Sequence, residues 1–133
     1  MMDIELQNEL FHEYSPFFED GESNQVLTLI ECGNGWFDLI NSLCEVISDY
    51  FEMNYEIIDF PISDFYFSDI SEKNGKLRIY TSISDKSIDG MIKYVEHHSS
   101  YVCEISGERG ALYKKNGYYK TLSPFKAREL GFL

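Results

Sequence analysis

The chain has 133 residues and a formal net charge of −12 at pH 7, with 44% hydrophobic and 16% aromatic residues. This length fits a single domain over residues 1–133, and the hydrophobic content excludes a disordered chain. We find no apolar run of the roughly 20 residues that cross a bilayer and no signal peptide, so we expect a cytoplasmic protein whose three cysteines are reduced.

The charges are divided unevenly along the chain. Residues 1–72 contain 17 acidic side chains and no Lys or Arg, whereas residues 73–133 contain all 11 basic side chains and only 6 acidic ones. An acid-only surface repels phosphates and anionic lipid headgroups, so we expect no direct nucleic-acid binding and no membrane binding. The charge favours a basic protein as partner.

The first two predicted elements are a short helix and a strand. Asp3–Tyr14 has apolar residues at loosely helical spacing, and the helix should end at Ser15 because a residue before proline avoids the α region. Gln25–Glu31 reads QVLTLIE, which is rich in β-branched and aliphatic residues and predicts a short strand.

The clearest helix is predicted from about Trp36 to Phe51. Its apolar residues recur at i, i+3, i+4 and i+7, so one stripe must face a core, and Asn34 is the expected N-cap. The opposite side carries four carboxylates: Asp38, Glu45, Asp49 and Glu52. Three of them lie near the C-terminal end, where the helix dipole disfavours negative charge, so they indicate either a solvated face or a use outside folding.

An extended connection with edge-strand character is predicted over residues 55–67, because Pro61 interrupts a regular strand. The pair Asn74-Gly75 then predicts a type I′ hairpin between Asp69–Lys73 and Lys76–Ser82.

The second main helix is predicted from about Asp85 to His98, with Ser84 as its cap. Three more strands are expected: Tyr101–Ile105, Ala111–Lys115 and Tyr118–Leu122. Ser123 should cap a last helix that stops at Gly131. Together these elements predict an α+β fold, with a small antiparallel sheet built from hairpins, two main helices packed on it, and short N- and C-terminal helices.

Four stretches of the chain carry recognisable motifs. They are CGNGWFDLINSLC from Cys32 to Cys44, EKNGKLRIY from Glu72 to Tyr80, CEISG from Cys103 to Gly107, and GYYKTLS from Gly117 to Ser123. In this order they resemble a family of small uncharacterised proteins found in phages and prophages, over roughly residues 30–131. The resemblance implies the fold above and a zinc knuckle near the C-terminus.

The chain departs from that family at the metal ligands. Of the expected cysteine and histidine ligands only Cys103 remains, and the other three places hold Ser106, Ser123 and Lys126. We therefore predict a degenerate zinc-ribbon-like hairpin plus helix over about residues 101–133, with no metal and no other cofactor. Aromatic and aliphatic packing onto the body should replace the metal, through Tyr113, Tyr118, Leu122, Phe125 and Leu130.

No residue pattern indicates a reaction. Cys32 or Cys103 can be paired with His97 or His98 as a nucleophilic site, but a reduced cysteine is more often a small buried residue, and Cys32 lies in the acid-only half. Residual metal binding by Cys103 and the histidines also stays open. We predict no catalytic residue and a protein that is not an enzyme.

The predicted partner-binding site follows the acidic side of the main helix into the connection after it. There, carboxylates that attract a basic surface are interleaved with rigid aromatic side chains. The assigned residues are Glu45, Asp49, Glu52, Tyr55, Glu56, Asp59, Asp64 and Phe65.

In composition and size the chain resembles immunity proteins that neutralise nuclease toxins, and phage inhibitors that imitate the charge of nucleic acid. The leading expectation is an immunity protein or inhibitor that blocks a basic toxin or nucleic-acid-processing enzyme by protein–protein contact. The alternative is a phage-type accessory protein, structural or regulatory, whose acidic half pairs with its own basic half.

Overall fold

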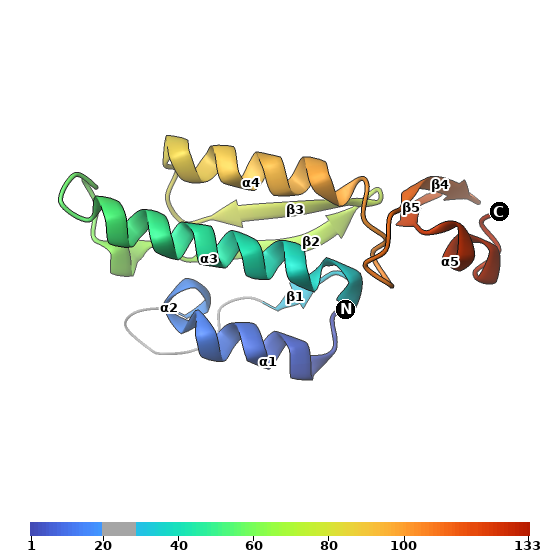
Figure 1. Ribbon diagram of the computed structural model, residues 1–133, viewed down its shortest axis with the longest axis horizontal. Coiled ribbons are helices and arrows are strands. Elements are labelled where there is room, and N and C mark those ends of the chain that lie inside the picture. The colour runs from blue at the N-terminus through green and yellow to red at the C-terminus, as the bar shows by residue number, and fades with distance from the viewer. Residues whose placement is uncertain (20–28) are drawn as a thin grey trace.

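The computed structural model describes residues 1–19 and 29–133, and Figure 1 shows their arrangement. The described elements, in chain order, are α1 (Ile4–Glu13), α2 (Ser15–Phe18), β1 (Ile30–Glu31), the 3₁₀ helix η1 (Asn34–Trp36), α3 (Phe37–Asn54), the 3₁₀ helix η2 (Ile62–Asp64), β2 (Phe67–Lys73), β3 (Lys76–Thr81), α4 (Lys86–Ser99), β4 (Ala111–Lys115), β5 (Tyr118–Leu122) and α5 (Pro124–Glu129). They form an α+β fold, which confirms the predicted class. No helix among the described residues is both long enough and apolar enough to span a bilayer.

The described strands form two sheets instead of the single antiparallel sheet expected. In the first, β2 lies between β1, which runs parallel to it, and β3, which runs antiparallel. The second sheet is the β4–β5 hairpin. Both hairpins turn at an Asn-Gly pair with positive φ at both residues, which are 54° and 81° at Asn74 and Gly75 and 52° and 83° at Asn116 and Gly117. The predicted type I′ geometry is therefore confirmed.

Two predicted strands have different outcomes. Of Gln25–Glu31, the last two residues form β1, and residues 25–28 lie outside the described part of the chain. The prediction of a strand over Tyr101–Ile105 is wrong, because this segment turns and makes only one bridge, between Val102 and Arg109. Its backbone bonds go to separate places, from the Cys103 N–H to the Glu108 carbonyl at 2.7 Å and from the Glu104 N–H to the Thr121 carbonyl at 3.0 Å.

Two predicted helix caps are also corrected. Asn34 lies inside η1, where its side chain exchanges hydrogen bonds with Asp3 at 2.8 and 2.9 Å, so it does not cap α3. The N-cap of α4 is Asp85, whose Oδ1 accepts from the backbone N–H groups of Ser87 and Ile88. Ser84 instead donates its hydroxyl to Asp89, also across the start of α4. Ser123 does cap α5, as predicted, by accepting from the N–H of Lys126 at 3.2 Å.

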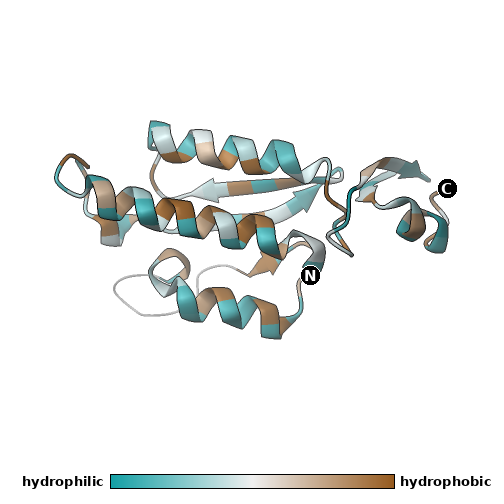
Figure 2. Cartoon of the chain, viewed as in Figure 1, coloured by the Kyte–Doolittle hydropathy of each residue, from teal (hydrophilic) through white to brown (hydrophobic). Residues whose placement is uncertain are grey.

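The main core lies between the helices and the three-stranded sheet. Helices α3 and α4 pack side by side, α4 covers β3, and α1 and α2 lie on the other side of α3 (Figure 1). Hydrophobic and hydrophilic residues alternate around α3 as its amphipathic pattern requires (Figure 2). The largest fully buried side chains of this core are Trp36, Phe18, Phe65 and Phe67.

The C-terminal module, residues 101–133, sits at one end of the long axis of the molecule (Figure 1). It joins the body where Trp36 Nε1 donates to the Val102 carbonyl at 2.8 Å and the Gly35 N–H donates to the Glu104 carbonyl at 2.7 Å. The carboxylate of Glu104, only 5% exposed, accepts from the Gly33 N–H and pairs with Lys120 at 3.3 Å. The motif CGNGW is therefore a docking turn for this module.

The expected aromatic packing of the C-terminal module is largely wrong. Its small core consists of Cys103, Leu122 and Ala127, with Tyr113 and Phe132 packed beside them. Three side chains expected there are exposed instead: Tyr118, Phe125 and Leu130. A β-hairpin with one short helix can cover only one of its faces, so these side chains point to solvent.

Candidate functional site

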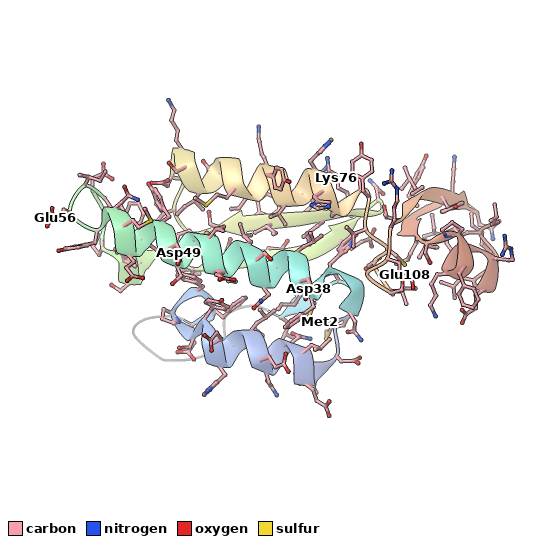
Figure 3. All side chains as sticks on the ribbon, viewed as in Figure 1. Met2, Asp38, Asp49, Glu56, Lys76 and Glu108 are labelled. Atoms are coloured by element: carbon pink, nitrogen blue, oxygen red, sulfur yellow. The ribbon has the colours of Figure 1, made fainter. Side chains whose placement is uncertain are left out.

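The outward side of α3 carries a row of exposed carboxylates, here named the acidic row: Asp38, Glu45, Asp49 and Glu52. Their spacing of seven, four and three residues places them on one stripe of the helix. With a rise of 1.5 Å per residue the row extends over about 21 Å. Asp38 and Asp49 are labelled on α3 in Figure 3. Opposite the row lies the buried stripe, which ties α3 to the core.

The acidic row continues toward α1. Burial raises the pKa of the Tyr14 hydroxyl, and the neighbouring Cys44 and the carboxylates of Glu45, Glu13 and Asp49 raise it further. These carboxylates therefore lie within electrostatic range of one phenol, at the break between α1 and α2. Sequence reasoning missed Glu13 because no pattern along the chain relates the end of α1 to the middle of α3.

The acidic surface also continues past the C-terminal end of α3. Tyr55 is 66% exposed, and its hydroxyl donates to the Glu56 carboxylate at 3.2 Å. Glu56 lies at the end of the molecule farthest from the C-terminal module (Figure 3). Asp59 is exposed in the segment after the turn at residues 55–57, and Asp64 is exposed in η2. The structure thus places seven of the eight assigned residues on the surface.

Phe65 is the eighth, and its assignment to the binding surface is wrong. Its side chain is fully buried, with ring centroids 5.6 Å from Phe17, 5.3 Å from Phe51 and 5.8 Å from Phe67. Phe65 and Phe67 both point inward because alternate residues of an extended chain face the same side. We therefore remove Phe65 from the candidate surface.

In the described part of the chain, the carboxylates of the candidate surface form no ion pair. Within residues 1–19 and 29–133, the ion pairs are Lys120–Glu104 and Lys126–Glu129, both inside the C-terminal module. Lys76, one of the first basic residues along the chain, lies far from Glu56 along the long axis (Figure 3). The basic half of the chain therefore does not neutralise the acidic row by direct ion pairs in the described part of the structure.

The cysteine and histidine residues considered as a nucleophilic site lie in different settings. Burial and the charge of Glu104 raise the pKa of the Cys32 thiol to about 12, which opposes a thiolate there. His97 and His98 are exposed near the end of α4, where their rings meet the edges of Tyr101 and Tyr94.

Cys103 is buried, and its sulfur accepts hydrogen bonds from the turn that follows it. Its sulfur accepts from the Ser106 N–H at 3.3 Å. Burial acts to raise the pKa of this thiol, but hydrogen bonds from Ser106, Ser123 and Ile105 outweigh burial and lower it. Among the residues that the structure describes, no three His, Cys, Asp or Glu side chains gather closely enough to hold a metal ion.

No protein-family model matches the chain, and neither the curated proteins nor the solved structures contain a significant match.

Proposed function

We propose that this protein is a non-enzymatic binding protein that inhibits a basic, nucleic-acid-handling protein, as an immunity protein does for its toxin. The contact surface is the acidic row together with Tyr55, Glu56, Asp59 and Asp64. The main support for this proposal is that the carboxylates of this surface are exposed and form no ion pair within the described residues.

The placement of these carboxylates supports a role outside folding. Asp49 and Glu52 lie in the last turns of α3, where the helix dipole makes a negative charge unfavourable by about 0.3–1 kcal/mol. The like charges of Glu45 and Asp49, four residues apart on α3, add a repulsion of about 0.2–0.5 kcal/mol. A cationic partner would turn both costs into attraction and would accelerate encounter.

The alternative function, an accessory protein whose acidic and basic halves neutralise each other, has less support. It requires ion pairs between the acidic and the basic half of the chain. The ion pairs of the described residues, Lys120–Glu104 and Lys126–Glu129, both lie within the basic half.

The test of the proposed function is a pull-down from cells that encode the neighbouring gene, using the wild-type chain and the triple variant Glu45→Lys, Asp49→Lys, Glu52→Lys. We expect the wild type to capture a basic protein and to inhibit its activity on nucleic acid. The triple variant should lose both effects, and rising salt should weaken the wild-type complex.

The matched control reverses three exposed carboxylates outside α3: Glu5, Glu31 and Glu108. This control changes the net charge by the same amount and should keep binding. An equal loss of binding in both triple variants would show that total charge, and not the surface on α3, determines the interaction. Unchanged binding and unchanged salt dependence in the α3 variant would refute the proposal.

A further inference from the structure

An apolar groove of about 520 Å³ runs between α3 and α4, next to the acidic row. Its walls include Ser42 and Val46 from α3 and Gly90, Met91 and Tyr94 from α4. Two packed helices with a hydrophobic groove between them form the usual receptor for an amphipathic helix.

The groove leaves large apolar side chains in contact with water. Of the lining side chains, Val46 is 44% exposed and Tyr94 is 70% exposed; Met53, which does not line the groove but follows Val46 by seven residues on the same side of α3, is 81% exposed. Exposed apolar side chains that gather beside a groove mark an interaction site, whereas isolated ones carry no such meaning.

Gly90 provides independent support for an occupant. It lies inside α4, where glycine is less favourable than alanine by about 0.8–1.0 kcal/mol. A Cβ at this position would meet no atom within 4 Å, so no packing contact within the described structure requires a glycine here. The missing side chain instead leaves a notch in the wall of the groove.

Charge along the groove indicates the chemistry of the occupant. Glu45 and Asp49 of the acidic row lie three residues from Ser42 and Val46, respectively, so both carboxylates border the α3 wall. Lys93 of α4 lines a different groove, between α4 and β3, and Lys86, four residues before Gly90 at the start of α4, is not among the residues that line the apolar groove. One rim of the apolar groove is therefore negative, without a facing lysine among the residues that line it.

We propose that the groove binds an amphipathic helix of the protein partner, with an apolar face in the groove and a row of Lys or Arg side chains against Glu45 and Asp49. This inference rests on the proposed function and adds the form and chemistry of the bound segment. The large exposed side chains of Val46, Met53 and Tyr94 would be the apolar contacts, and the notch at Gly90 would admit a side chain of the helix.

The test uses a synthetic helical peptide of about 18 residues, or five turns, with Leu at i, i+3, i+4 and i+7 spacing and Lys elsewhere. A second peptide has Glu in place of every Lys. Binding to the full ¹⁵N-labelled chain is followed by amide chemical shifts. We expect the shifts to centre on Val46, Gly90 and Tyr94, and the Glu peptide to bind at least roughly tenfold more weakly, a difference of about 1.4 kcal/mol.

The variant Gly90→Phe should fill the notch and weaken the binding of the Lys peptide by at least roughly tenfold. His97→Phe, an aromatic substitution on α4 outside the groove, should leave binding unchanged. Because the Cβ position of Gly90 is open, Gly90→Phe should fold, and its melting temperature checks this. Val46→Glu is a second variant, which introduces a polar side chain into the α3 wall of the groove.

Three results would overturn the inference. Shifts confined to the acidic row and insensitive to Gly90→Phe would mean ion pairing without docking in the groove. Equal binding of the Lys and Glu peptides would show a general apolar site without preference for a basic segment, and no binding of either peptide would exclude the helix. In each case the charge-reversal experiment on α3 with the natural partner still tests the proposed function separately.

Discussion

Gly35 illustrates how one backbone position can hold two parts of the chain together. A Cβ on this residue would lie 2.1 Å from the carbonyl oxygen of Cys103, whereas the Gly35 N–H donates to the carbonyl of the next residue, Glu104. Backbone atoms cannot yield as a flexible side chain does. The C-terminal module can dock on η1 only because this position has no side chain.

We therefore expect Gly35→Ala to lower the free energy of unfolding by about 2 kcal/mol or more, measured by urea denaturation. Gly90→Ala is the matched control, since its added Cβ meets open space in a helix, and it should raise the free energy of unfolding by about 0.5–1 kcal/mol. Similar effects of the two substitutions would contradict the docking role of Gly35.

The three thiols should differ in acidity for reasons that depend on their immediate surroundings. Burial raises the pKa of Cys32 and Cys44, the former to about 12, whereas hydrogen bonds lower the pKa of Cys103 below its ordinary value.

A pH titration followed by the ¹³Cβ shifts of labelled cysteine should show Cys103 ionising first as the pH rises. Cys103→Ala should remove that first step. Ser106→Gly removes the hydroxyl donor and keeps the backbone N–H, so an unchanged Cys103 pKa in this variant would show that the Ser106 hydroxyl does not lower it.

Capping residues partly define where a helix begins, and α4 shows why the tertiary structure is needed to identify the capping residue. Ser84 and Asp85 are both good N-cap residues, and they are adjacent in the sequence. Asp85 is the cap because its backbone is extended, with φ −135° and ψ 129°, and its side chain reaches two N–H groups. Its other carboxylate oxygen accepts from the Tyr50 hydroxyl at 3.0 Å, which links α4 to α3.

Asp85→Ala should therefore lower the free energy of unfolding by about 1 kcal/mol or more, because the substitution removes the cap and the bond to Tyr50. Ser84→Ala, which removes one exposed side-chain hydrogen bond, should cost less. Thermal denaturation of both variants by circular dichroism measures the difference. A larger loss for Ser84→Ala would show that the cap is misassigned.

The charge distribution acts over the entire chain. Seventeen carboxylates precede the first basic residue, Lys73, and the net charge is −12. Ion pairs among the described residues do not link the two halves, so mutual repulsion of the carboxylates should oppose folding.

Raising the ionic strength from about 0.01 to about 0.5 M should therefore increase the melting temperature, since salt screens this repulsion. A chloride salt with weak ion-specific effects, compared with an equal osmolarity of an uncharged solute, separates screening from osmotic effects. A decrease of the melting temperature would instead indicate internal pairing of the acidic and basic halves, and would favour the accessory-protein alternative.

Much of this architecture follows from the sequence by itself. The apolar period of α3 and the two Asn-Gly pairs predict their structures because the determinants are local: one helical face, and two residues that tolerate positive φ. The uneven charge is likewise a property of the sequence. These features predicted the α+β class and seven exposed residues of the candidate surface.

Tertiary contacts decided the rest. Residues 101–105 lack a strand because their backbone groups bond to η1 and β5, and Phe65 is buried because the chain enters β2 beside Phe17 and Phe51. The groove at Gly90 exists only because α4 packs against α3. These properties depend on groups far apart in the chain, whose proximity no local pattern encodes.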